Sequence, residues 1–151
     1  HLVLIGDGED AAALRDLSRT LDLEGRIHFV GPIFNERKIA SYMRMADAAI
    51  IPEAGLPIIH PMGYGVPPVI SDNIHRHGTE WEAVEEGQTG FFYRDGDTAD
   101  LAATVRRCLE DEDRRSAVTR NCRARVQERY TAEGHAARIY EGVLKLGGMR
   151  S

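Results

Sequence analysis

Short runs of apolar residues alternate with helical stretches along this 151-residue chain. Each run is continuously apolar, which is typical of strands that are covered on both faces. This alternation predicts an α/β fold, a Rossmann-like open parallel sheet with helices on both faces. The predicted strands are residues 2–5, 27–30, 48–51, 67–71 and 89–93, the last of them short and near an edge. The predicted helices are residues 11–21, 36–46, 56–65, 97–109, 112–130 and 132–146.

Length, charge and cysteine content narrow the class of protein. At about 150 residues per domain, residues 1–151 are expected to form a single domain. The formal net charge of −5 leaves no basic field of the kind that nucleic-acid binding requires. No apolar run approaches the roughly 20 residues of a membrane span. Cys108 and Cys122 lie at apolar positions of predicted helices, so we interpret them as reduced core thiols of a cytoplasmic protein.

Ligands of open α/β sheets bind beyond the carboxyl ends of the strands, here residues 6–10, 31–35, 52–56 and 71–80. After the first strand, Gly6, Gly8 and Ala11 match the G-x-G-x-x-G/A dinucleotide pattern. The next strand lacks the acidic residue that would hold a ribose. Acidic side chains in the turn itself would repel a pyrophosphate. We therefore interpret these glycines as a tight strand–helix turn.

The segment after the third strand is the most informative for binding. Gly55 permits close approach of the backbone, and Pro57 suits the first turn of a helix. Free N–H groups at such a helix start suit an anion such as a diphosphate, and His60 follows about one turn later. A structural Gly–Pro junction without a ligand is the equal alternative on these residues alone.

Two further patterns favour structural interpretations. His75 and His77 have no third ligand close in sequence, whereas zinc takes three or four, so no metal is expected. The six arginines of residues 112–130 are interleaved with acidic residues and indicate a solvated face. A partner or a membrane surface is the alternative for that face.

An ordered series of segments carries a family resemblance over residues 2–146. The chain resembles the C-terminal, donor-binding half of the retaining glycosyltransferases with the GT-B fold, family 4, also called group 1. Each motif is weak by itself, but the order and the intervals are specific. The segments are GDGED, RIHFVGPI, ADAAIIP, GLPIIHPMGYGVPPVISDN, TEWEAVEEGQTGFFYRDGD and DLAATVRRCLED.

The resemblance implies a set of donor-binding residues. Family members carry E-G-F-G-L-P-x-x-E after this strand, and Gly55, Leu56 and Pro57 match its centre, whose amides hold the donor diphosphate. His60 stands where the family has the Glu that binds the ribose hydroxyls. A neutral imidazole makes one hydrogen bond there, not the two-acceptor grip of a carboxylate on a diol.

Other implied residues are placed less directly. The family's first Glu, which contacts the donor sugar, aligns with Pro52, and Glu53 follows one residue later. Either Glu53 takes that role, as a weak catalytic candidate, or the acid is lost. Pro32 and Ile33 align with the segment that meets the nucleobase. The loop at residues 77–78 is expected near the donor sugar or in solvent.

The resemblance also implies what would lie outside this sequence. Family members open this half with a strand and a G-R-x-x-x-x-K-G segment whose cations neutralise the diphosphate, and an acceptor-binding domain precedes it. Neither stands before His1, so the domain is expected to lack its first strand, and the fragment alone is expected to transfer no sugar.

The function implied is that of the nucleotide-sugar-binding domain of a retaining hexosyltransferase. The parent enzyme would move a hexosyl group from an NDP-sugar to a sugar or lipid-linked acceptor, as in polysaccharide biosynthesis. The donor is a substrate, and no cofactor or metal is expected. Cytoplasmic location with peripheral membrane association of the parent fits the family. An NDP-sugar epimerase of the same fold and a non-catalytic nucleotide-sugar-binding module are the alternatives.

Overall fold

The computed structural model describes residues 1–52 and 58–148. The chain divides into two compact units, the first spanning His1–Tyr42 and the second beginning at Met43. Each unit is described by itself below. The single domain expected over residues 1–151 stays a prediction.

The first unit is built around a parallel strand pair. Leu2 lies opposite Ile27 and Leu4 lies opposite Phe29, so the register of the pair matches the two predicted apolar runs. The guanidinium of Arg15 lies 4.5 Å from the centre of the Phe29 ring, which places the connecting helix against the second strand. The elements are β1 (Leu2–Ile5), α1 (Ala11–Thr20), β2 (Ile27–Gly31) and the start of α2 (Glu36–Met45).

Burial in the first unit differs from the prediction. The side chains of β1 are expected to be covered on both faces, yet Leu2, Val3 and Ile5 are about two-fifths exposed, so this expectation is wrong for β1. Helix α1 buries Ser18, while its apolar stripe, which includes Leu17, is exposed. The physical reason is that apolar composition records how much a strand can bury. It does not record which neighbours are present to cover it.

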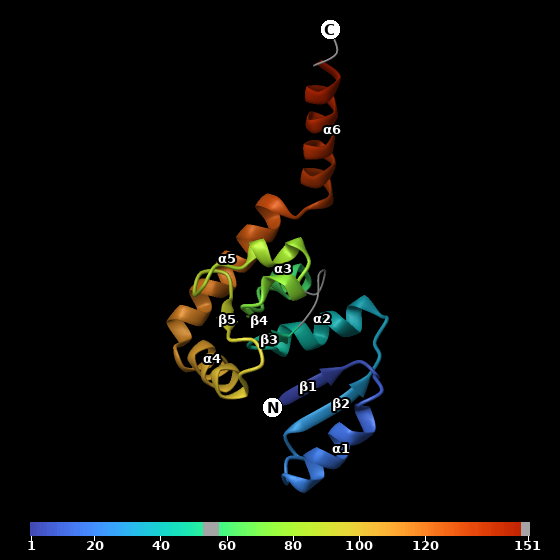
Figure 1. Cartoon of the computed structure of the whole chain (residues 1–151), viewed down its shortest axis with the longest axis vertical. Coiled ribbons are helices and arrows are strands. Elements are labelled where there is room, and N and C mark those ends of the chain that lie inside the picture. The colour runs from blue at the N-terminus through green and yellow to red at the C-terminus, as the bar shows by residue number, and fades with distance from the viewer. Residues whose placement is uncertain (53–57, 149–151) are drawn as a thin grey trace. The chain divides into compact units, whose positions relative to one another are not determined.

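The second unit contains the larger sheet and most of the helices. Its strands are parallel in the order β3-β4-β5, so β4 is central and β5 lies at an edge as predicted (Figure 1). The strands and the short helices between them are β3 (Ala49–Ile51), α3 (Ile59–Tyr64), β4 (Pro68–Ser71), η1 (Ile74–Arg76), η2 (Thr79–Ala83) and β5 (Phe91–Tyr93). The remaining helices are α4 (Thr98–Glu110), α5 (Glu112–Arg129) and α6 (Ala132–Gly148).

The core of the second unit forms around the central strand. All four residues of β4 are buried. Met62 of α3 and Phe91 of β5 are fully buried beside it, and Trp81 of η2 packs against the same cluster. Helix α5 contributes Val118 and Cys122, which confirms the prediction that Cys122 lies in the core.

The arginines of α5 are not simply a solvated face, and that interpretation needs correction. The Arg114 guanidinium lies 5.3 Å from the centre of the buried Phe91 ring. Arg123 donates to the carbonyl of Tyr64, 2.9 Å away, and so holds the end of α3. Arg125 pairs with Glu85 and Arg115 pairs with Asp47. These side chains attach α5 to the loops around the sheet, which the sequence pattern alone did not indicate.

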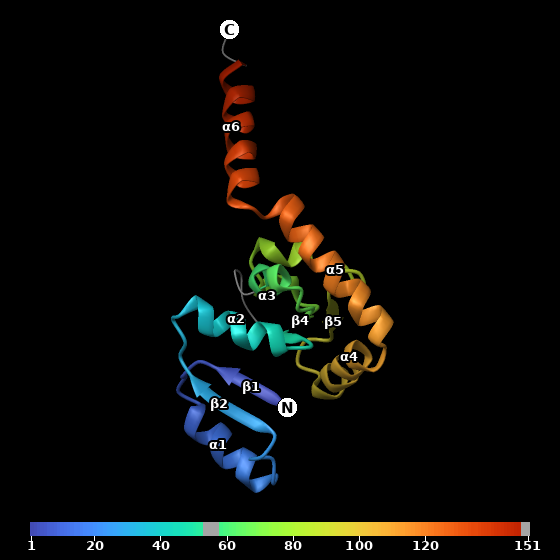
Figure 2. The same cartoon turned by 180° about the vertical axis from the view of Figure 1, so that it is seen from behind.

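Helix α6 begins at a capped end and extends away from α5 (Figures 1 and 2). The hydroxyl of Thr131 accepts a hydrogen bond from the amide of Gly134 and so caps the start of α6. Its apolar side chains, among them Ile139 and Val143, are more than half exposed. Among the described residues, no helix is both long and apolar enough to cross a membrane.

Candidate functional site

Three parallel strands of the second unit end at the same edge of its sheet. Ile51 of β3 lies opposite Ile70 of β4, and Ser71 lies opposite Tyr93 of β5. The carboxyl ends of these strands therefore lie side by side. This is the edge at which open α/β sheets bind ligands, and it includes two of the segments selected from the sequence.

The segment after β3 contains most of the predicted donor-binding residues. Four of them, Glu53, Gly55, Leu56 and Pro57, lie outside the described residues. His60 is described, is exposed, and makes an edge-to-face contact with Tyr64 at 5.5 Å between ring centres.

Helix α3 is shorter than predicted. It begins at Ile59 rather than near residue 56 and has six residues instead of about ten. Ile58, just before it, is fully buried in the core, so tertiary packing determines where the described helix begins. A helix of six residues aligns few peptide dipoles, which weakens the dipole argument for anion binding.

The predicted nucleobase segment belongs to the first unit. Pro32 is exposed and Ile33 is half-buried, and both lie between β2 and α2. His60 belongs to the second unit. The joining of these three residues in one site stays a prediction.

The loop after β4, residues 72–78, is called the β4 loop here. Its far end is tied to the strand by His77, whose Nε2 lies 3.1 Å from the carbonyl oxygen and 3.0 Å from the hydroxyl of Ser71. A carbonyl oxygen only accepts, so Nε2 carries the proton and donates to it. The other ring nitrogen, Nδ1, is buried without a hydrogen-bond partner among the described residues. His77 therefore anchors the loop, whereas His75 is exposed.

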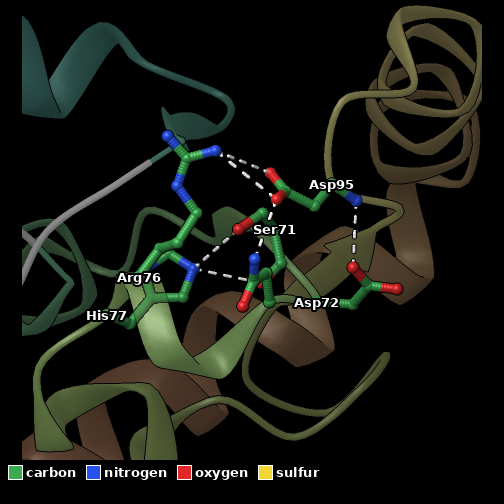
Figure 3. Close-up of polar contacts among 6 residues, drawn as sticks. Ser71, Asp72, Arg76, His77 and Asp95 are labelled. Atoms are coloured by element: carbon green, nitrogen blue, oxygen red, sulfur yellow. Dashed lines mark hydrogen bonds and ion pairs between the residues drawn. The ribbon is translucent and has the colours of Figure 1, made fainter.

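A carboxylate that sequence reasoning missed holds the middle of the β4 loop (Figure 3). Asp95, two residues after β5, accepts a hydrogen bond from the side-chain amide of Asn73 at 3.0 Å. The Arg76 guanidinium lies 3.4 Å from the same carboxylate. The amide of Asp95 donates to the Asp72 carboxylate at 2.9 Å. The available signal was position alone, because Asp95 follows a strand that ends at the ligand-binding edge.

Hydrogen bonding and burial shift the pKa values of ionisable groups near this edge. The hydrogen bond from Asn73, followed by contact with Arg76, lowers the pKa of Asp95. The amide of Asp100 at the start of α4 lowers the pKa of Asp97. Burial, aided by the nearby Asp95 charge, raises the pKa of Tyr93. All three shifts move the pKa further from neutrality, so the two aspartates stay charged and Tyr93 stays neutral near pH 7.

Comparison with known proteins establishes the family. The family described as "Glycosyl transferases group 1" matches residues 1–125, which is most of the chain. The chain belongs to this family.

Individual relatives agree with that assignment. The N-acetyl-alpha-D-glucosaminyl L-malate synthase of Bacillus anthracis is 27% identical over 151 residues, covering 95% of this chain and 38% of the relative. Among solved structures, the sucrose-phosphate synthase of Thermosynechococcus elongatus has a TM-score of 0.79 at 25% identity. The match covers 98% of this chain and 38% of the synthase chain. The Anabaena protein HepE, solved in complex with UDP-glucose, has a TM-score of 0.78 at 26% identity. The match covers 95% of this chain and 40% of the HepE chain.

The comparisons confirm the predicted fold class. The solved structures are GT-B glycosyltransferases, and the parallel α/β fold with helices on both faces is that of their C-terminal domains. The chain spans about two-fifths of the length of the relatives described above.

Proposed function

We propose that this chain binds the nucleotide-sugar donor of a retaining glycosyltransferase. The parent enzyme transfers a hexosyl group from an NDP-sugar to a sugar or lipid-linked acceptor, as in polysaccharide biosynthesis. One observation carries the proposal: β3 and β4, the strands that precede His60 and the β4 loop in the sequence, are adjacent, parallel and end at the ligand-binding edge. The HepE structure with bound UDP-glucose supports this class of ligand.

The proposed roles follow the chemistry of the donor. Backbone amides of the segment around Gly55, Leu56 and Pro57 stabilise the departing diphosphate. Negative charge develops on this leaving group in the transition state. His60 makes one hydrogen bond to the ribose, and Glu53 contacts the sugar. Pro32 and Ile33 meet the base. The rest of the catalysis is positioning of donor and acceptor.

The wider assignments are also proposals. The donor is a substrate, and we expect no metal or other cofactor in the reaction. The remaining length of the relatives is the reason to place the acceptor-binding domain outside these residues. The 151-residue chain alone is therefore expected to transfer no sugar. Cys108 and Cys122 are free thiols, which supports a cytoplasmic location, with peripheral membrane association of the whole enzyme.

The first test is a calorimetric titration of the full-length gene product with UDP-glucose, GDP-mannose, ADP-glucose and NAD. We expect saturable binding of one nucleotide sugar and none of NAD. His60→Ala should weaken that binding about fivefold, the effect of one neutral hydrogen bond. His60→Glu should strengthen it by a similar factor, because a carboxylate accepts from both ribose hydroxyls.

The matched control is His135→Ala. His135 is exposed on α6, which comes directly after α5 and not after a strand that ends at the ligand-binding edge. Loss of the His135 side chain should therefore leave binding unchanged. Equal effects of the two alanine variants would contradict the role of His60. Failure of every nucleotide sugar to bind the wild-type protein would contradict the proposed function. Consumption of the donor without an acceptor, with return of a sugar epimer, would favour the epimerase alternative.

A further inference from the structure

The β4 loop is held by side chains rather than by the sheet. The backbone ladder between β4 and β5 continues for one more hydrogen bond, from the amide of Asp72 to the carbonyl of Tyr93 at 2.8 Å. Beyond this point Asp95 connects the end of β5 to the loop. Its carboxylate engages Asn73 and Arg76, and its amide engages Asp72 (Figure 3).

Two carboxylates that follow β5, those of Asp95 and Asp97, bind different parts of the structure. Asp97 accepts from the amide of Asp100 at 2.9 Å and so caps α4. Asp95 turns the other way along the sheet edge, toward the β4 loop. One therefore acts on a helix and the other on a loop, although both side chains are partly buried.

The geometry of the loop gives Asp95 a role beyond folding. The loop presents Ile74 and His75 to solvent at the edge of the sheet where β3 also ends. Ordering a loop before a ligand arrives removes the conformational entropy that binding would otherwise cost. The Asp95 carboxylate is charged near neutral pH, and its hydrogen bond from Asn73 lowers its pKa further.

We infer that Asp95 is a positioning residue, which holds the β4 loop in its donor-binding conformation through Asn73 and Arg76. The inference rests on the proposed function. Asp95 acts through the loop and does not itself touch the donor. Its loss should therefore weaken donor affinity and raise the donor KM, while the acceptor KM stays unchanged.

The test compares Asp95→Ala with Asp97→Ala in the full-length gene product. The probe is whichever of UDP-glucose, GDP-mannose and ADP-glucose the wild-type protein binds most tightly. Asp95→Ala should raise the dissociation constant about tenfold, the effect of one lost charge-assisted hydrogen bond. Asp97→Ala removes a helix cap, so it should lower Tm and leave the dissociation constant within about twofold, well under the effect of one lost hydrogen bond.

A double-mutant cycle identifies the route from Asp95 to the loop. Asn73→Ala should weaken binding in the same direction, and the Asn73→Ala/Asp95→Ala double variant should bind no worse than Asp95→Ala alone. Asp95→Asn retains an acceptor for Asn73 but loses the charge that faces Arg76, so it should fall between the wild type and Asp95→Ala. This conservative variant keeps the test usable if Asp95→Ala folds poorly.

Three results would overturn the inference. The first is a lower Tm for Asp95→Ala with unchanged donor affinity, and the second is an equal loss of affinity in Asp97→Ala. The third is strict additivity of the Asn73 and Asp95 substitutions. A wild-type protein that binds none of the three nucleotide sugars contradicts the proposed function itself. That failure is visible before any variant is measured.

Discussion

At the scale of single residues, burial determines the chemistry of the two cysteines. Cys108 and Cys122 are almost completely buried, one on α4 and one on α5. The Cys122 thiol donates to the carbonyl of Thr89 at 3.1 Å. Burial raises the pKa of Cys108 to about 11 and that of Cys122 to about 12. Their prediction as core thiols, made from apolar helical positions, agrees with these surroundings.

Both thiols should resist alkylation in the native protein. Below pH 9 the native thiols stay protonated, and only the thiolate reacts. We expect iodoacetamide at pH 8 to label neither cysteine over hours, and to label both within minutes in guanidinium chloride. Mass spectrometry of the labelled chain measures this. Fast labelling of either residue in the native protein would contradict its burial.

The same raised pKa values set a direction for alkaline stability. The neutral native thiols contribute stability that is fully present below the unfolded pKa, near 9. This contribution is lost as the pH rises toward the native values of about 11 and 12.

Residue-scale prediction from sequence succeeded where the environment followed from a repeating pattern. The inward face of α5 could be predicted because Val118, Cys122 and Val126 recur every four residues. Asp95 could not be selected in this way. Its role depends on Asn73, which is 22 positions away in sequence and becomes a neighbour only because β4 and β5 pair in parallel.

At the scale of elements, close packing limits the size of the side chain at position 90, just before β5. A Cβ added to Gly90 would lie 2.7 Å from the carbonyl oxygen of Pro68 and 2.9 Å from a methyl carbon of Val84. Both neighbours are buried, and one of the two contacts is with backbone, so neither can move easily. Gly90 therefore permits β4 and β5 to approach each other.

Gly90→Ala should lower the free energy of unfolding by about 1–3 kcal/mol, the usual cost of overpacking a core. Gly63→Ala is the matched control, because its added Cβ meets Val126 at an ordinary 3.9 Å. Since Gly63 lies within α3, alanine there should be neutral or stabilising by up to about 1 kcal/mol. Urea unfolding of both variants measures the difference. Equal stability of the two would show that Gly90 is not tightly packed.

Elements with a strong local signal were predicted closely, and α3 was not. The bounds of β1 agree residue for residue, since a turn follows the apolar run at once. The sequence predicts that α3 begins near residue 56, because Gly55 and Pro57 are typical of the start of a helix. Ile58 is fully buried at that point, and packing of this kind has no signature in local sequence.

At the scale of the whole molecule, burial is distributed unevenly between the two units. The core cluster lies in the second unit and includes β3, β4 and β5. In the first unit, most residues of β1 and the leucines of α1 are between about two-fifths and one-half exposed. The α/β class could be predicted from the order of elements. The uneven burial could not, because an apolar run looks the same whether or not it is covered.

Hydrogen exchange should follow this distribution in the 151-residue chain. A backbone amide exchanges when the structure around it opens, and the free energy of this opening rises with the number of buried contacts. We expect the amides of β1 and β2 to exchange before those of β4, and those of α6 to exchange before those of α5. Exchange measured by NMR or mass spectrometry tests both orders. Uniform protection across β1 and β4 would show that the two units unfold together.

The position of Trp81 has a consequence for optical measurements on this chain. It is the single tryptophan of the sequence, and it packs against the core of the second unit. Fluorescence excited at the red edge of tryptophan absorption therefore reports the melting of that core and nothing from the first unit. Far-ultraviolet circular dichroism records the helices of both. A gap between the two melting curves would be a direct spectroscopic signature that the units lose structure separately.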